Sequence, residues 1–145
     1  MANFLNCLLV MLILLFGCSC GDRKTKISVT GNSIPVFTLS GSGLITDFAI
    51  YGPRQRAGDQ QAAFAVWQLV PVSDIDSLDD VSSISSIKYG IIPKGYKQVY
   101  PEGGTSPTPL PEGVKYLLQI TTVNAPWGQL AFEIRAGRAV EIPIK

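Results

Sequence analysis

The sequence predicts an all-β fold, an antiparallel sandwich or barrel built as one domain. Apolar and polar residues alternate over several short stretches, as they do on strands with one buried face. No stretch shows sustained helical periodicity. Fourteen glycines and ten prolines separate the apolar stretches, as turns between short strands require. These observations favour two sheets that bury their apolar faces against each other.

Three apolar stretches in the first half of the chain are predicted strands. Residues 34–39 and 44–51 are separated by Ser40-Gly41-Ser42-Gly43, a composition typical of a hairpin turn. Residues 62–72 are almost continuously apolar around Trp67, which indicates a central strand buried on both sides.

The second half of the chain predicts three more strands. Residues 73–86, rich in Ser and Asp, are the one plausible helical insertion, and residues 100–111 contain four prolines and predict an irregular crossing between sheets. Residues 114–123 alternate, as do Leu130, Phe132 and Ile134. Gly137 then turns the chain into a last strand over residues 139–144.

The N-terminal residues 1–17 predict a signal peptide. Residues 8–16 are wholly apolar, which is the length of a signal-peptide hydrophobic region and well below the roughly 20 residues that span a bilayer. The end of this run, Leu15-Phe16-Gly17-Cys18, resembles the bacterial lipobox, Leu-x-(Gly/Ala)-Cys. The resemblance implies a bacterial lipoprotein cleaved before Cys18, which then carries a diacylglycerol and an N-acyl chain such as palmitate. In a Gram-negative cell, Ser19 resembles the usual signal for the outer membrane, facing the periplasm.

The charges around this run leave one alternative. The first 21 residues contain no Lys or Arg, whereas Arg23, Lys24 and Lys26 follow the apolar run. The positive-inside rule would then favour an uncleaved anchor, although the run is short for one. Cys20 is a poorer lipidation site, because it places Gly17 three positions before the cleaved bond.

A short polar tether, residues 18–26, precedes the predicted sandwich of residues 27–145. Fully extended, the part between Cys18 and Lys26 reaches about 25 Å, so the domain is expected close to the membrane. Cations beside an acyl anchor add attraction to anionic lipid, although a solvated linker is an equally good interpretation.

Composition excludes several classes of function. The net charge of +1 provides no basic surface for nucleic acid. The absence of histidine removes Ser-His-Asp and Cys-His catalysis and the usual zinc ligand. Of three cysteines, Cys7 leaves with the signal peptide and Cys18 carries lipid. Cys20 then stands alone, free or paired between chains, so the exported domain must rely on its core rather than an internal disulfide.

A second resemblance concerns the architecture. Leu110-Pro111-Glu112-Gly113-Val114-Lys115-Tyr116 resembles the tyrosine corner of fibronectin type III and immunoglobulin-like domains, in which the Tyr hydroxyl hydrogen-bonds back to the backbone. Residues 116–128 are similar to the F strand and F–G loop of these domains. The resemblance implies an immunoglobulin-like sandwich in which Trp67 is the core tryptophan.

This resemblance predicts one binding patch. If residues 44–51, 62–72, 114–123 and 129–135 are strands B, C, F and G, the B–C and F–G loops share one end. Arg54 and Arg56 would then lie beside Trp127, a composition typical of binding hot spots. Alternatively, Trp127 packs back on the core and the arginines are solvated. In this topology the N-terminus lies at the same end of the sandwich as the patch, unless residues 27–30 form a separate strand.

Two sets of carboxylates have a plainer interpretation. Asp74, Asp76, Asp79 and Asp80 do not match the spacing of an EF-hand, so a solvated loop is expected there rather than a metal site. Asp47 and Glu133 are predicted to point outward from their strands, where nothing in the sequence pairs them, and a two-carboxylate hydrolase is a remote alternative.

Together these observations predict a non-enzymatic, lipid-anchored envelope protein that binds or scaffolds another envelope protein, with no cofactor and no catalytic residue. The alternative is an immunity or inhibitor lipoprotein that blocks a toxin or an envelope hydrolase.

Overall fold

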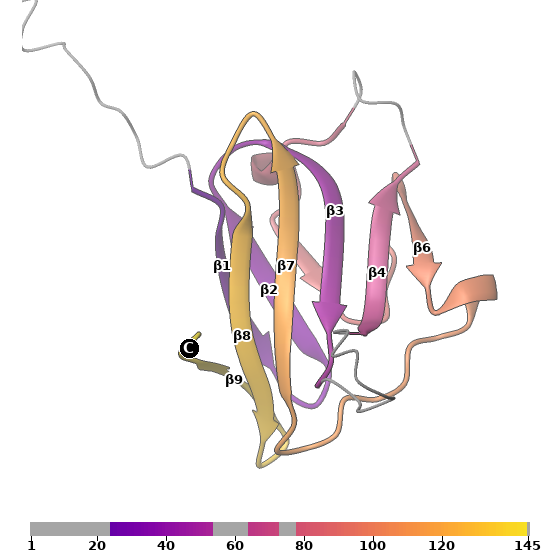
Figure 1. The fold of residues 1–145 in the computed structure, drawn as a ribbon, viewed down its shortest axis with the longest axis vertical. Helices are drawn as coiled ribbons and strands as arrows, with labels where there is room; N and C mark the ends of the chain where they lie inside the picture. The colour runs from indigo at the N-terminus through magenta and orange to yellow at the C-terminus, as the bar shows by residue number, and fades with distance from the viewer. Residues whose placement is uncertain (1–23, 54–63, 73–77, 145) are drawn as a thin grey trace, which may run out of the picture.

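A computed structural model of the chain describes residues 24–53, 64–72 and 78–144, and within them it contains two antiparallel sheets packed face to face (Figure 1). The predicted all-β sandwich is therefore confirmed. The smaller sheet has the strand order β1-β2-β5, from β1 (Lys26–Gly31), β2 (Pro35–Ser40) and β5 (Ser86–Lys88). The larger has the order β6-β4-β3-β7-β8-β9, from β3 (Leu44–Tyr51), β4 (Ala65–Pro71), β6 (Tyr96–Tyr100), β7 (Lys115–Val123), β8 (Gly128–Arg135) and β9 (Arg138–Ile142).

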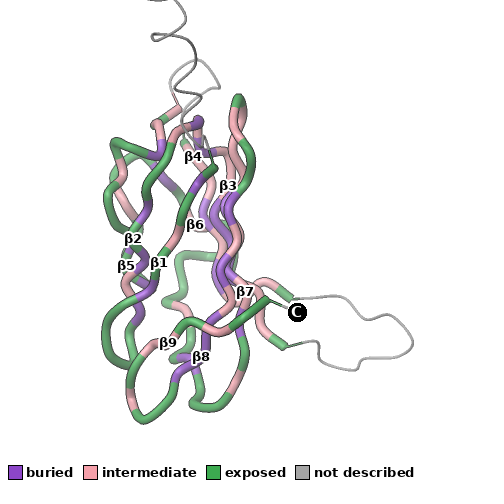
Figure 2. Tube along the Cα trace, turned by 90° about the vertical axis from the view of Figure 1, so that its left-hand side faces the viewer, coloured by how far each residue is buried: buried purple, intermediate pink, exposed green. Residues whose placement is uncertain are grey.

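The core lies between the sheets, and along strands of both layers buried positions alternate with more exposed ones (Figure 2). Phe37 of β2 packs edge-on against Phe48 of β3 and Phe132 of β8, with ring centroids 5.9 and 5.2 Å apart. Phe48 continues to Trp67 and Trp67 to Tyr89, also edge-on. Edge-to-face pairs add to the stabilisation from buried area, so one aromatic chain joins the two sheets.

Trp67 is fully buried, as expected of a core tryptophan, and its strand has one buried face rather than two. Its indole Nε1 donates to Gln98 Oε1 at 2.9 Å, and Gln98 Nε2 donates to the carbonyl oxygens of Pro101 and Thr105, each at 2.7 Å. On the opposite face of β4, Val66, Gln68 and Val70 are only half-buried. The strand is therefore not the doubly buried central strand that its composition predicted.

The predicted hairpin between residues 34–39 and 44–51 is wrong. β2 and β3 belong to different sheets, so residues 41–43 carry the chain from one layer to the other. Gly41 and Gly43 have φ of +122° and +119°, a region that strongly favours glycine. The Gly43 N–H donates to Asp80 Oδ2 at 3.0 Å. A Gly-Ser composition indicates a reversal of direction but not which strand the chain pairs with next.

Two further expectations need correction. The described part of the predicted helical insertion holds only a 3₁₀ turn, η2 (Val81–Ser83), followed by strand β5. The proline-rich crossing is irregular, with a short 3₁₀ turn, η3 (Glu102–Gly104). However, it begins after β6 and ends at β7 in the same sheet rather than joining the two sheets.

The edge of the sandwich between β1 and β9 is closed. β1 is a separate strand whose Lys26 pairs with Ser40 of β2, and at the far end of β1 Asn32 bridges to Arg138. The Val29 N–H donates to Glu141 Oε1 at 3.1 Å. The last predicted strand, β9, therefore protects an edge that would otherwise be exposed.

The expected tyrosine corner forms only in part. Leu110 and Tyr116 are buried and Gly113 has a φ of +71°. Among the hydrogen bonds of the described residues, none comes from the Tyr116 hydroxyl. Instead Tyr89 donates its hydroxyl proton to the Thr108 carbonyl at 2.7 Å. Burial and the nearby Tyr116 raise the pKa of Tyr89 to about 12, so this donor keeps its proton at neutral pH.

Within the described residues, no helix is both long and apolar enough to cross a membrane.

Phe37→Ala tests whether this aromatic chain holds the sheets together. The cavity and the lost burial should lower the free energy of unfolding by about 3–5 kcal/mol in urea denaturation. Phe37→Leu should lose less, and Thr38→Ala at the exposed neighbouring position should change the stability little. A loss below about 1 kcal/mol for Phe37→Ala would show that the sheets do not depend on this ring.

Candidate functional site

Trp127 is exposed at one end of the sandwich, in the turn between β7 and β8. Its exposed fraction is 55%, so the alternative in which it packs on the core is wrong. The segment that carries Arg54 and Arg56 lies outside the described residues. That segment leaves β3 at Tyr51, which pairs with Leu117, whereas Leu44 pairs with Val123 next to the Trp127 turn.

The assignment of residues 44–51 and 62–72 to strands B and C is therefore wrong. β3 and β4 are neighbours in one sheet, not strands of two sheets, and the Gly52 N–H donates to Phe64 O at the Tyr51 end of β3. At about 3.3 Å per residue, the Tyr51 and Leu44 ends of β3 are about 23 Å apart. The strand ends that lead to Arg54 and Arg56 thus lie at the opposite end of the sheet from Trp127.

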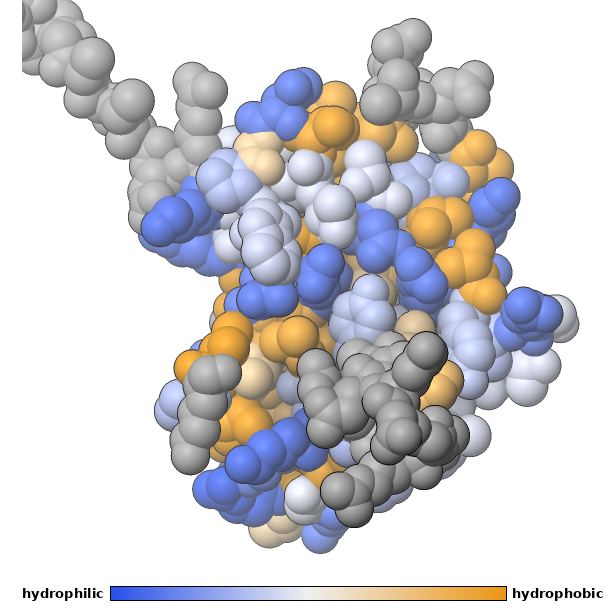
Figure 3. Space-filling view, viewed as in Figure 1, coloured by the Kyte–Doolittle hydropathy of each residue, from blue (hydrophilic) through white to orange (hydrophobic). Residues whose placement is uncertain are grey.

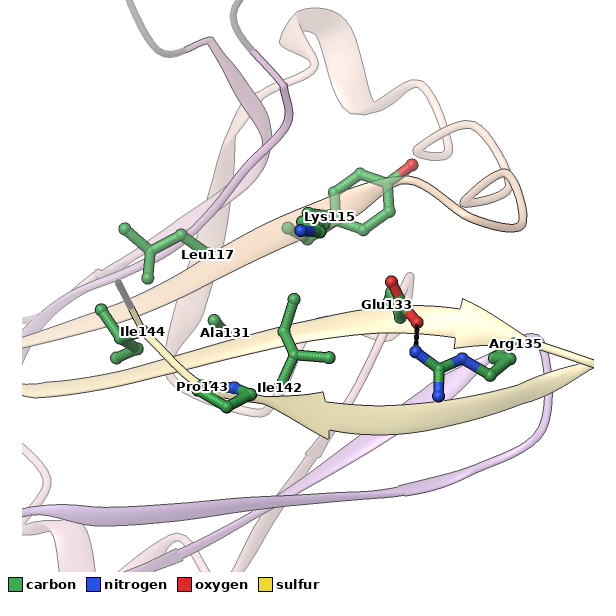
Figure 4. Close-up of a pocket in the computed structure, with 9 residues that line it drawn as sticks. Lys115, Leu117, Ala131, Glu133, Arg135, Ile142, Pro143 and Ile144 are labelled. Carbon is green, nitrogen blue, oxygen red and sulfur yellow. Dashed lines mark hydrogen bonds and ion pairs between the residues drawn. The ribbon is translucent and has the colours of Figure 1, made fainter.

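A concave surface of the described residues lies on the outer face of β7, β8 and β9. We call it the outer hollow, a depression of about 440 Å³ lined by nine residues: Lys115, Tyr116, Leu117, Ala131, Glu133, Arg135, Ile142, Pro143 and Ile144. Figure 4 shows Leu117, Ala131 and Ile144 gathered at one end and the Glu133–Arg135 ion pair at the other. In the space-filling view, apolar atoms gather at the lower left with hydrophilic residues below them (Figure 3).

Strand register assembles the outer hollow from separate segments. Leu117 of β7 pairs with Ala131 of β8, and Ala131 pairs with Ile142 of β9, so three apolar side chains lie side by side on the outer face. Lys115 and Glu133 form the next cross-strand pair. The inner-face residues alternate with these and fill the core.

Glu133 is the buried polar group of the outer hollow. Only 7% of its surface is exposed, and its Oε1 accepts a hydrogen bond within an ion pair from Arg135 Nη2. A carboxylate removed from water requires such a partner. The Arg135 side chain is itself 67% exposed, so part of its charge stays available at the rim.

The rim of the outer hollow carries a small excess of positive charge. Lys115 and Arg135 border it, and Arg138 pairs with Arg135 in the strand register. Glu133 supplies one opposing charge, and the carboxylate of Glu112, which accepts from the Gly137 N–H in the β8–β9 turn, supplies another. An apolar floor with a charged rim is the usual anatomy of a protein-binding surface, and the excess of cations favours an acidic partner segment.

Asp47 and Glu133 do point outward, as predicted, but they are far apart. Asp47 pairs with Thr121 of β7 and Glu133 pairs with Lys115 of the same strand, and these two positions on β7 are about 20 Å apart. Paired glycosidase carboxylates lie within about 10 Å of each other. Asp47 accepts a hydrogen bond from Gln68 Nε2 at 2.7 Å. Burial raises the pKa of Asp47 above its usual value, and this hydrogen bond offsets part of the rise. The geometry gives the two-carboxylate hydrolase no support.

Asp80 has a structural role. Its carboxylate accepts from the backbone N–H and the hydroxyl of Ser82 and from the backbone N–H of Gly43. These hydrogen bonds lower the pKa of Asp80 and attach η2 to the crossing between the sheets. Asp74 and Asp76 lie outside the described residues, and the described residues contain no group of three metal-ligating side chains.

The proposed lipidation residue, Cys18, and the neighbouring Cys20 also lie outside the described residues. The structure describes the chain from Lys24, so the tether enters at the Lys26 end of β1. Lys26 pairs with Ser40, next to the crossing that leads to Leu44, and Leu44 pairs with Val123 at one end of β7. Lys115 and Glu133 pair at the other end of β7. This end of the outer hollow therefore lies opposite the tether.

No protein-family model, curated protein or solved structure matches the chain.

Arg135→Ala tests the ion pair that orders the rim. The substitution leaves the buried Glu133 carboxylate without its cation, so the free energy of unfolding should fall by about 1–2 kcal/mol. Adding Glu133→Gln removes the uncompensated charge. The double variant should therefore regain part of the lost free energy of unfolding, as measured by denaturant titration. If the double variant is as unstable as Arg135→Ala alone, the loss comes from the Arg135 side chain itself rather than from the isolated carboxylate.

Proposed function

We propose that this protein is a lipid-anchored, non-enzymatic binding module of a bacterial cell envelope, with Cys18 as the anchor. The outer hollow is its binding surface for a partner protein. The observation that carries this proposal is the position of the outer hollow: its charged rim lies at the end of the sandwich opposite the tether. A partner can approach it without meeting the membrane.

The chemistry of the outer hollow supports a protein partner. Leu117, Ala131 and Ile142 form an apolar floor on three hydrogen-bonded strands. Lys115 and Arg135 place charge at its border. Such a surface selects a segment with an apolar side chain flanked by carboxylates. The same residues include neither a nucleophile–base pair nor paired carboxylates, so binding is the function that they support.

The strand order supports an immunoglobulin-like sandwich as the scaffold. β1-β2-β5 facing β4-β3-β7-β8 follows the order A-B-E facing C′-C-F-G of that architecture, with β6 and β9 as additions. In this correspondence β3 and β4 are strands C and C′, not B and C. The Trp127 turn is then the F–G loop, and it faces the tether.

Photo-crosslinking in the producing cells tests the binding surface. A benzoylphenylalanine in place of Leu117 should form one discrete adduct with an envelope protein, and the same probe at Thr38, exposed on the other sheet, should not. Lys115→Glu in the Leu117 probe strain should weaken the adduct severalfold, because it reverses a rim charge.

Identical adducts from Leu117 and Thr38, or an adduct that Lys115→Glu leaves unchanged, would contradict the outer hollow as the binding surface. Identifying the captured protein as a toxin or an envelope hydrolase would favour the inhibitor hypothesis over a scaffold.

A further inference from the structure

We propose that the tether-side end of the sandwich rests on the membrane surface, with the indole of Trp127 in the headgroup region. The tether-side end comprises residues 24–25, the sheet crossing at residues 41–43 and the hairpin turn at residues 124–128. The inference rests on the proposed lipid anchor and adds a second contact with the same bilayer.

Three chain segments converge closely at this end. A Cβ on Gly128 would lie 3.0 Å from the Thr25 carbonyl oxygen, and one on Gly41 would lie 2.7 Å from the Lys24 carbonyl oxygen. On the other side of the crossing, a Cβ on Gly43 would lie 2.6 Å from Ala125 Cβ. The domain-side end of the tether, residues 24–25, is thus packed against the hairpin turn that carries Trp127, and the two share one surface.

The turn holds Trp127 outward. Asn124 adopts the left-handed conformation with a φ of +65°, and Thr122 Oγ1 donates to the Ala125 carbonyl at 2.9 Å. These features fix the reversal between β7 and β8. Trp127 is 55% exposed, whereas Trp67 is fully buried. An indole with an apolar body and a polar N–H is the side chain most suited to a membrane–water interface.

The length of the intervening chain favours lipid as the occupant. Only residues 19–23 separate Cys18 from Lys24, and fully extended they span about 20 Å. An acylated Cys18 therefore keeps the tether-side end within about 20 Å of the headgroups, where a partner protein has little room.

The charges at the tether-side end are of both signs. Lys24 and Lys26 are exposed on either side of Thr25, which contacts Gly128. Each cation near an anionic surface adds a favourable interaction. Asp79 and Asp80 also lie toward this end, beside the start of β3. The hydrogen bonds from Gly43 and Ser82 keep the Asp80 carboxylate ionised, so the two carboxylates offset the two cations and the contact rests on the indole of Trp127.

Tryptophan quenching by brominated lipids tests this contact. The full protein, extracted from membranes, is reconstituted into vesicles of phosphatidylethanolamine and phosphatidylglycerol with or without bromine on the acyl chains. The Trp127→Phe variant reports Trp67 alone, so the difference between the two proteins gives the emission of Trp127. Brominated lipid should reduce the Trp127 emission about twofold or more and leave Trp67 unchanged.

The outcomes separate this inference from the anchor. If the wild-type protein floats with the vesicles and the Trp127 emission is unaffected by bromine, the surface contact is overturned and the anchor stands. If the protein does not float with the vesicles, both are overturned. Equal quenching of the wild-type and Trp127→Phe proteins would also contradict the contact, because the buried Trp67 would then be the quenched residue.

Discussion

The sandwich depends on the contact that Phe37 makes between Phe48 and Phe132. It joins a three-stranded sheet to a six-stranded one, and the described residues contain no cysteine that could join them covalently. Packing alone must therefore keep the layers in register. Because the register of β8 follows from Phe132 facing inward, the same contact also decides that Ala131 and Glu133 face outward and form the outer hollow.

Sequence patterns predicted the sandwich because alternation reports one buried face for each strand, and the Leu130, Phe132 and Ile134 series is a clear case. They could not predict pairing. Residues 40–43 have the composition of a hairpin turn, yet they cross between sheets, and Asp80, far along the chain, helps to hold that crossing. Such long-range hydrogen bonds leave no signal in the local sequence. The local sequence also does not show whether β3 and β4 pair in one sheet or lie in opposite sheets.

The site could be predicted less well than the fold. Trp127 is exposed, as the predicted patch requires. Its predicted partners depended on an assumed strand assignment, and the register places the strand ends that lead to Arg54 and Arg56 at the opposite end of the sheet. The outer hollow was missed, although a sign of it is present in the sequence: Leu117, Ala131 and Ile142 are apolar at positions that alternation assigns to the outer face. Only the register shows that they are neighbours.

The two ends of the molecule suit the two tasks that we propose: Trp127 and the tether would face the membrane, and the rim of the outer hollow would face away from it. Both depend on the anchor at Cys18, which the intact mass of the membrane-extracted protein tests most directly. If Cys18 is the anchor, the mature chain begins at Cys18 and carries the added mass of a diacylglycerol and an acyl chain. A mass that still includes residues 1–17, or an unmodified Cys18, would contradict it.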